Sequence, residues 1–332
     1  MPSRPLGRPL GKLLVITAIG ALSLSAFAPI VGAANGPVAW QATAGVSTND
    51  QAVQANAFLP SDLTVDVGDT VTWTIASGEF HTVTFLSGAD APPLIVLGQN
   101  GPEFNPAAVA PSGGPAYDGT GIHSSGLLFK GQTYTQQFTT PGTYAFLCLV
   151  HAGMAGTLHV QAADTAYPRT QAQIDTQTLV AGNGLRASGR TLEARSLAAA
   201  RSSGPGLAVV GAGQALPGTG SVAVMRFLPG KLVVHAGDTV TWSNLDPETP
   251  HTITFGTEPG GGPLGAFLPS GGDGPGHATI GDPTQSVNSG FIGAGLPFGT
   301  SYSATFTTPG TYNFICALHD DLGMTGTIVV VP

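Results

Sequence analysis

Short runs of alternating apolar and polar residues occur throughout the chain and predict half-buried β-strands. Leu63–Val67 and Val71–Ile75 each have an apolar residue at every second position, which places those side chains on one face of a strand. Gly68 and Asp69 separate the two runs, and both are typical of a hairpin turn. Strands of this kind cover one another in a two-sheet sandwich, so the pattern predicts an all-β fold.

The same series of motifs occurs twice along the chain. The run from Gly68 to Trp73 recurs from Gly237 to Trp242, and residues 138–144 recur letter for letter at 306–312. Identical runs inside an already matching frame indicate a tandem duplication. We therefore expect two β-sandwich units, one at residues 50–162 and the other at residues 221–332.

Two segments lie outside the repeated units. Residues 1–34 begin with basic residues, continue with an apolar run and end with small residues, which predicts a secretory signal peptide. The apolar run is also long enough for a retained N-terminal membrane anchor. Either interpretation predicts an extracytoplasmic protein: periplasmic, cell-surface or secreted. Residues 163–220 are expected to form a solvated, partly helical linker, with a short helix at 191–201 and a flexible stretch at 204–206.

Composition narrows the class of protein further. Charged residues make up only 9% of the chain, which contains 48 glycines and 27 prolines and is typical of a turn-rich β protein. The formal net charge of −8, without a basic stripe, argues against a nucleic-acid partner. Two cysteines are too few for a disulfide framework. A single disulfide is the alternative in an exported protein, but it would have to join equivalent positions of two separate units.

Each unit contains one cysteine, followed by a histidine and a methionine, with a second histidine far upstream. One thiolate, two imidazoles and one thioether form a soft ligand set that suits copper, held by three strong ligands and a long axial methionine. A lone buried histidine or a core methionine would be ordinary, but the matched occurrence in both units favours ligands. The candidate metal ligands are His81, Cys148, His151, Met154, His251, Cys316, His319 and Met324.

These motifs resemble the cupredoxin family of blue copper proteins. The Cys-x2-His-x2-Met loop of the first unit is similar to that of amicyanin and pseudoazurin, and the Cys-x2-His-x4-Met loop of the second is similar to that of plastocyanin. The resemblance implies two tandem Greek-key β-sandwiches, each with one type 1 copper that cycles between Cu2+ and Cu+. It also implies that the loop histidines, His151 and His319, reach the surface and serve as electron ports.

One position departs from the family pattern. Plastocyanin-like sequences often carry asparagine directly after the upstream histidine, where it ties that strand to the cysteine loop. This chain has Thr82 and Thr252 at the two positions. A hydroxyl can make part of the same hydrogen bonding, so we expect copper binding to be kept.

Single-electron transfer between redox protein donors and acceptors is the function that the resemblance implies. One alternative is a two-domain copper enzyme, an oxidase or a nitrite reductase. Such enzymes need a second copper centre with His-x-His pairs and a histidine directly before the cysteine, whereas Leu147 and Ile315 stand there and the sequence contains no His-x-His.

The other alternative, copper storage or delivery, usually depends on Met-rich or His-rich tracts, and the chain has four methionines. We therefore expect an electron carrier rather than an enzyme, without a small-molecule substrate. Membrane association is expected only if the N-terminal segment is retained.

Overall fold

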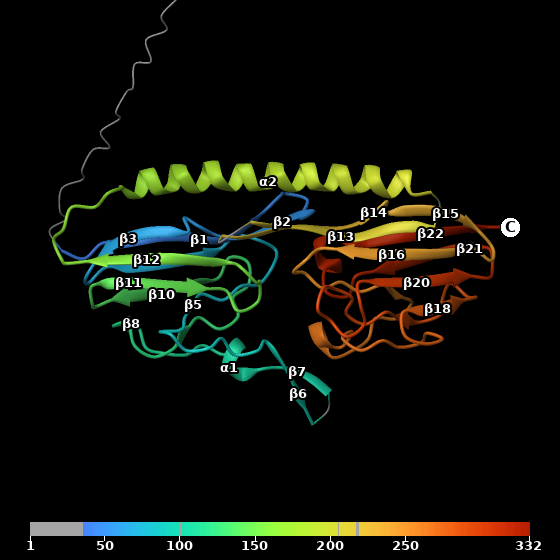
Figure 1. Ribbon diagram of the computed structural model, residues 1–332, viewed down its shortest axis with the longest axis horizontal. Coiled ribbons are helices and arrows are strands. Elements are labelled where there is room, and N and C mark those ends of the chain that lie inside the picture. The colour runs from blue at the N-terminus through green and yellow to red at the C-terminus, as the bar shows by residue number, and fades with distance from the viewer. Residues whose placement is uncertain (1–35, 100, 205, 217–218) are drawn as a thin grey trace, which may run out of the picture.

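The computed structural model describes residues 36–99, 101–204, 206–216 and 219–332 (Figure 1). The signal peptide or anchor predicted at residues 1–34 lies outside the described residues. Within the described ranges, the search for a helix of sufficient length and hydrophobicity to span a membrane finds none.

The first half of the chain forms two β-sheets that enclose an apolar core. One sheet contains strands in the order β2-β1-β4-β10-β8, and the other contains β3-β12-β11-β5-β9. A β6–β7 hairpin and the short helix α1 extend from this half (Figure 1). The elements are β1 Ala39–Ser47, β2 Val53–Leu59, β3 Asp62–Asp66, β4 Thr70–Ile75, β5 Thr84–Phe85, β6 Ile95–Gly98, β7 Gly101–Phe104, α1 Pro106–Val109, β8 Ala116–Tyr117, β9 His123–Ser124, β10 Thr133–Phe138, β11 Gly142–Leu147 and β12 Ala155–Gln161.

The second half repeats this arrangement. Its sheets have the orders β18-β20-β16-β13-β14 and β15-β22-β21-β17-β19. The elements are β13 Leu207–Leu216, β14 Gly220–Leu228, β15 Lys231–His235, β16 Thr239–Leu245, β17 Thr254–Phe255, η1 Gly262–Leu264, β18 His277–Ile280, β19 Val287–Asn288, β20 Ser301–Phe306, β21 Gly310–Ile315, η2 Asp320–Leu322 and β22 Thr325–Val331. The predicted all-β fold with two tandem sandwiches is thereby confirmed.

The repeated tryptophans form equivalent centres of the two cores. Trp73 packs edge-on against Phe146 with ring centroids 5.4 Å apart, and Trp242 packs against Phe314 at 5.3 Å. All four rings are buried. Edge-to-face aromatic pairs of this kind stabilise a core beyond the burial of their area, so each half has the means to hold its strands rigidly.

The two halves share one continuous sheet. Strand β2 pairs antiparallel with β14, so that Ala57 lies opposite Gly220 and Val53 lies opposite Val224. This pairing joins the two larger sheets into a ten-stranded sheet that runs from β18 to β8. The relative position of the two sandwiches is therefore set by backbone hydrogen bonds.

Helix α2, Gln171–Ser202, lies across both halves (Figure 1), where the sequence predicts only a short helix within a solvated linker. It contacts β1, β2, β13 and β14, so the segment is a packed structural element and the spacer interpretation is wrong. The helix begins with a capping box, in which Thr170 and Gln173 satisfy each other's backbone N–H groups. Its packed face combines leucines such as Leu185 and Leu192 with buried Gly182, Gly189 and Ser196, so the apolar pattern of that face is interrupted in the sequence.

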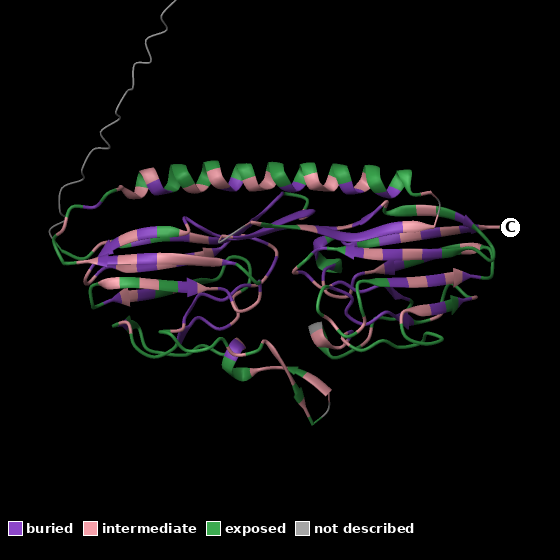
Figure 2. Cartoon of the chain, viewed as in Figure 1, coloured by how far each residue is buried: buried purple, intermediate pink, exposed green. Residues whose placement is uncertain are grey.

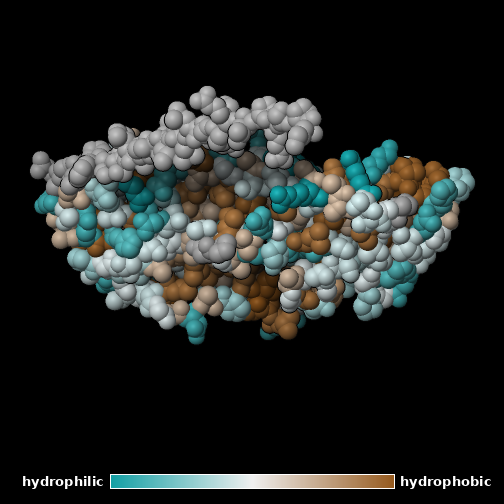
Figure 3. All heavy atoms as spheres, turned by 45° about the horizontal axis from the view of Figure 1, so that its top comes forward, coloured by the Kyte–Doolittle hydropathy of each residue, from teal (hydrophilic) through white to brown (hydrophobic). Residues whose placement is uncertain are grey.

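The burial of residues in α2 and in the sheet beneath it is consistent with the packing of the helix on the sheet. Figure 2 shows that buried residues concentrate in the strands of the long sheet, while α2 is mostly exposed or intermediate. Figure 3 shows hydrophobic surface near the middle of the face that it presents, between the two halves, and a second patch at the right-hand end. One face of α2 thus covers part of the sheet, and its polar face is exposed to solvent.

Candidate metal centres

The first candidate centre lies at one end of the first sandwich. His81 follows β4 in the loop to β5, Cys148 follows the last residue of β11, and His151 lies in the loop to β12. The Cys148 Sγ is 3.8 Å from Nδ1 of His81 and 3.8 Å from Nδ1 of His151, and the two Nδ1 atoms are 3.1 Å apart. All three side chains are buried, and their ligand atoms lie within 4.8 Å of one another.

The second centre repeats this geometry at the end of β21. The Cys316 Sγ is 3.7 Å from Nδ1 of His251 and 3.4 Å from Nδ1 of His319, and the two Nδ1 atoms are 3.2 Å apart. These side chains are buried as well. The structure therefore brings the thiol and both imidazoles of each predicted set to one point.

The two methionines lie on the same loops. The Cys148 backbone N–H donates to the carbonyl oxygen of Met154 at 2.9 Å, and the Cys316 N–H donates to that of Met324 at 3.0 Å. Both methionine side chains are buried in the same core clusters as the cysteines. The backbone hydrogen bond holds each methionine beside the cysteine of its loop. The role of the methionine as axial ligand stays a prediction.

The electrostatics of both centres favour the thiolate. Burial alone would raise the pKa of Cys148, but hydrogen bonds with His151 and His81 lower it well below its usual range. Burial alone would also raise the pKa of Cys316, but the charge of His319, more than any other contact, lowers it well below its usual range. Since the thiolate is the form that binds metal, each centre holds its sulfur ready for a soft cation.

The threonines after the upstream histidines tie the two ligand strands together. The Thr82 N–H donates to the Cys148 Sγ at 3.4 Å, and the Thr82 Oγ1 accepts from the Leu149 N–H at 2.8 Å. In the second centre, Thr252 makes the same two bonds, to the Cys316 Sγ at 3.3 Å and from the Ala317 N–H at 2.8 Å. The expected hydrogen bond between this hydroxyl and the cysteine loop is therefore present in both domains.

Sequence reasoning missed two glycines that leave room for the imidazole rings of His81 and His251, on the side of each ring away from the cysteine. Gly45 of β1, at a φ of 68° in a β-bulge, leaves room for the His81 ring, because a Cβ there would overlap the ring. Gly211 of β13, at a φ of 63°, does the same for His251. A glycine inside a strand is a recognised sign of a bulge or a close approach, and that signal was available in the sequence.

The two centres differ in the hydrogen-bond partner of the upstream histidine, His81 or His251. The His81 Nε2 lies 2.7 Å from the Ser77 Oγ, which leaves Nδ1 directed at Cys148. Among the described residues, Nε2 of His251 is buried without a hydrogen-bond partner. The rotation and basicity of the upstream ligand are therefore controlled by a hydrogen bond in the first centre alone.

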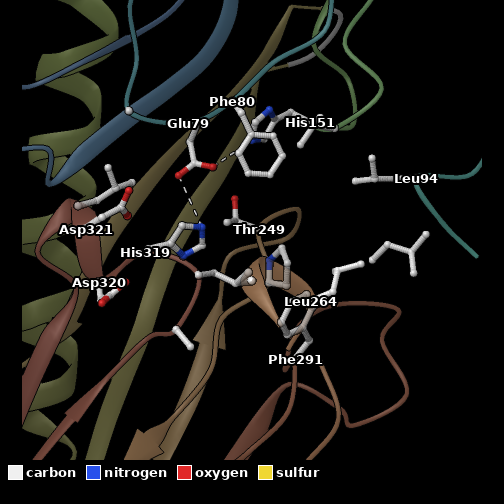
Figure 4. Close-up of a pocket in the computed structure, with 18 of the residues that line it drawn as sticks. Glu79, Phe80, Leu94, His151, Thr249, Leu264, Phe291, His319, Asp320 and Asp321 are labelled. Carbon is white, nitrogen blue, oxygen red and sulfur yellow. Dashed lines mark ion pairs between the residues drawn. The ribbon is translucent and has the colours of Figure 1, made fainter. Parts of the chain in front are cut away.

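Glu79 lies between the two centres (Figure 4). Its Oε2 is 3.6 Å from the His151 Nε2, and its Oε1 is 3.6 Å from the His319 Nε2. Burial alone would raise the pKa of Glu79, but the charges of His319 and His151 lower it to about 2. Burial lowers the pKa of both histidines, but hydrogen bonds with Cys148 and Glu79 raise that of His151 to about 10. The charges of Glu79 and Cys316 raise the pKa of His319 to about 9.

This arrangement differs from the surface ports that the resemblance implies. His151 and His319 are each only 5% exposed, and they approach each other from opposite domains. Both line a cavity of about 580 Å³ whose other walls are largely apolar, with Phe80, Leu264 and Phe291 among them. The two loop histidines are recessed because the shared sheet brings these ends of the two sandwiches together.

Comparison with known families agrees with this geometry. A model described as "Copper binding proteins, plastocyanin/azurin family" matches residues 45–161 and again residues 215–331. The plastocyanin of Scenedesmus fuscus is 34% identical over 114 residues, which cover 32% of this chain and 89% of that protein. The chloroplastic plastocyanin of Tetradesmus obliquus is 33% identical over 109 residues, covering 32% of this chain and 60% of that protein.

Solved structures give a similar list of relatives. An oxidised amicyanin mutant is 28% identical, with a TM-score of 0.20, and the match covers 30% of this chain and 70% of that one. A purple cupredoxin from Nitrosopumilus maritimus is 19% identical, with a TM-score of 0.23, over 37% of this chain and 99% of that one. At these TM-scores the structural likenesses add nothing to the match with the family model.

Proposed function

Because the chain belongs to the plastocyanin/azurin family of copper-binding proteins, we propose that it transfers single electrons between redox proteins outside the cytoplasm. Each of its two copper-binding domains would hold one type 1 copper. The observation that carries this proposal is the twofold convergence of one thiol and two imidazole Nδ1 atoms within 4.8 Å.

The donor chemistry of the described residues fits copper. In the first domain the ligands would be His81, Cys148, His151 and Met154, and in the second they would be His251, Cys316, His319 and Met324. A thiolate with two imidazoles and a thioether suits copper in a trigonal site with a weak axial ligand. When bound, copper supplies a one-electron couple between Cu2+ and Cu+.

The protein's own part is to hold these ligands still and to keep water away. The Thr82 and Thr252 N–H groups donate to the cysteine sulfurs, and such hydrogen bonds adjust the potential of a thiolate-bound metal. The cysteines and histidines are buried on strands and loops anchored in two aromatic cores. Ligands fixed in this way need not move when the charge of the ion changes, which suits rapid electron transfer.

The carrier function is favoured over an oxidase. Leu147 and Ile315 occupy the positions before the cysteines, where a second copper centre would need histidines. Within the described ranges, clusters of potential metal ligands occur at the two centres already described. The extracytoplasmic location is inferred from the signal-like pattern of residues 1–34, and the partners are inferred to be redox proteins.

Copper analysis combined with electron paramagnetic resonance (EPR) tests this proposal. We expect two coppers per chain, an intense blue oxidised form, and loss of one EPR signal and about half the colour in Cys148→Ser and in Cys316→Ser. Incubation with nitrite and with phenols serves as the test of the enzyme alternative. Zinc as the only bound metal, a copper that survives both substitutions, or sustained turnover of either substrate would overturn the carrier function.

A further inference from the structure

One carboxylate contacts the loop histidine of both domains. Glu79 lies in the loop between β4 and β5 of the first domain, two residues before the upstream histidine of its own centre. One of its oxygens faces His151 of the same domain and the other faces His319 of the second domain, each at 3.6 Å (Figure 4). A residue of one sandwich is thus part of the surroundings of both centres.

These contacts form a series of close approaches, each between 3.4 and 3.8 Å, from one sulfur to the other. The Cys148 Sγ lies 3.8 Å from Nδ1 of His151, and the Cys316 Sγ lies 3.4 Å from Nδ1 of His319. Each imidazole presents Nδ1 to its centre and Nε2 to Glu79. With both histidines 5% exposed and Glu79 4% exposed, the whole connection runs through the interior of the domain interface.

We propose that electrons pass between the two metal sites of one chain through the bridge formed by His151, Glu79 and His319. This inference rests on the proposed function, because it requires copper at both centres. One site is oxidised as the other is reduced, by one electron, and no covalent bond forms or breaks. Glu79 acts as a bridging residue, which holds both imidazoles in position and offers a continuous path between them.

The shared sheet makes this bridge geometrically fixed. Strands β2 and β14 pair over five residue positions, from Val53 opposite Val224 to Ala57 opposite Gly220. Helix α2 packs on both of these strands and restrains the same junction. Since backbone pairing and helix packing both join the domains, the distance between the two histidines is held by the fold.

A second glutamate near the bridge supplies a control residue. Glu248 lies three residues before the upstream histidine of the second domain, where Thr249 takes the position equivalent to Glu79, and it lines the same cavity. Its Oε1 lies 3.7 Å from the position that a Cβ on Gly153 would occupy, and it makes no ion pair with either loop histidine in the described part of the chain. Glu248→Gln therefore removes a similar charge from the same cavity without breaking the bridge.

The first experiment measures reduction potentials in chains that keep one copper. Glu79→Gln is placed in the Cys148→Ser background, which leaves only the second centre loaded, and in the Cys316→Ser background, which leaves only the first. We expect Glu79→Gln to shift the potential and the EPR parameters in both backgrounds, and Glu248→Gln, whose charge acts on His151 only from a distance, to cause a smaller shift at the first centre and none at the second. A purely local structural role in the first domain would not alter the second centre. Unchanged values at the second centre would therefore overturn the bridge.

The second experiment follows the electron itself. A substoichiometric radiolytic pulse reduces the two-copper protein, and timed frozen samples are analysed by EPR, with signals assigned from the single-copper variants. We expect a redistribution phase whose rate is independent of protein concentration, absent from the single-copper variants, and slowed about tenfold in Glu79→Ala but not in Glu248→Ala. Absence of that phase, or an equal rate in Glu79→Ala, contradicts the inference.

These results separate the two proposals. If both single-copper variants are blue and the redistribution phase is missing, the carrier function stands and the bridge is wrong. If copper does not bind at both centres, the proposed function itself fails. Glu79→Asp, which keeps the charge on a shorter side chain, is expected to restore part of the rate, and no recovery beyond Glu79→Ala would contradict a path through the carboxylate.

Discussion

Gly189 of helix α2 lies so close to Val53 of strand β2 that a Cβ atom at position 189 would overlap the valine Cγ1. The same Cβ would lie 2.9 Å from Cγ1 of Val222, which belongs to β14 of the other domain. The helix therefore touches the sheet most closely at the seam where the two halves pair. A side chain here has to displace β-branched residues whose rotamers are restricted.

Gly189→Ala is accordingly expected to destabilise the protein, although alanine is the better helix former. Overpacking of this kind costs about 1–3 kcal/mol, which exceeds the gain in helix propensity of about 1 kcal/mol. Denaturant unfolding of the purified protein measures the change. Gly182→Ala is the control, because a Cβ at position 182 would meet its nearest neighbours at 3.6 to 3.7 Å, which is ordinary contact. Equal stability of the two variants would show that the seam is not tightly packed.

Thr82→Val is expected to weaken metal binding at the first centre. The substitution keeps the shape of the side chain but removes the oxygen that accepts from the Leu149 N–H. A buried donor left without a partner costs about 1–3 kcal/mol, and loss of such an outer contact lowers metal affinity by about tenfold. Competition with a chelator in the Cys316→Ser background measures that affinity. Thr72→Val, on the neighbouring strand, is the control, and an affinity loss of the same size there would refute a specific role.

Ser77→Ala is expected to make the first centre resemble the second in one respect. It removes the oxygen that lies 2.7 Å from the His81 Nε2 and leaves this nitrogen without that partner, as the His251 Nε2 is within the described part of the chain. Because the hydrogen bond orients the imidazole and raises its basicity, its loss should change the EPR parameters and reduction potential of the first copper. The second copper should keep its values. A spectrum of the first copper identical to that of the wild type would show that Ser77 has no influence.

Stability should depend on pH through the ion pair between α2 and the first domain. The Arg190 Nη2 lies 2.6 Å from the Asp50 Oδ2, and hydrogen bonding to Arg190 holds the pKa of Asp50 well below its usual range. A carboxyl whose folded pKa is depressed stabilises the protein above its unfolded pKa of about 3.9, and this contribution is lost as the pH falls through the folded pKa.

Asp50→Asn is therefore expected to be less stable than the wild type above about pH 4 and to approach it in more acidic solution. Both side chains are about half exposed, so the difference should not exceed about 1 kcal/mol. Urea unfolding from about pH 2 to about pH 7 measures it. A difference that persists unchanged at the acidic end would point to a cause other than the charge.

The sequence predicted the local chemistry of each centre better than the relation between the centres. The cysteine, histidine and methionine motifs lie within short loops, and strand alternation places the upstream histidine on the core-facing side, so local patterns were sufficient. The hydrogen bond of the Thr82 hydroxyl was expected from the resemblance to plastocyanin-like sequences, in which the residue after the upstream histidine contacts the cysteine loop.

Contacts that depend on the pairing of β2 with β14 were not predictable in this way. Glu79 has no motif of its own, and its contact with His319 exists only because the shared sheet brings two distant loops together. The length of α2 was missed because glycines and a serine interrupt the apolar positions of its packed face, and glycine normally counts against a helix. Close approach of the backbone at Gly189 together with packing of Leu185, Leu192 and Leu197 holds that segment on the sheet.

The pairing of β2 with β14 also determines how the halves would behave if the chain were divided. A strand at the edge of a sheet presents unpaired N–H and C=O groups, which act as a template for another strand. Either half alone would expose such a row, along Val53–Leu59 in one fragment and along Gly220–Leu228 in the other. Separately expressed halves should therefore associate side by side, and the tandem chain tethers in one molecule two modules that would otherwise meet by diffusion.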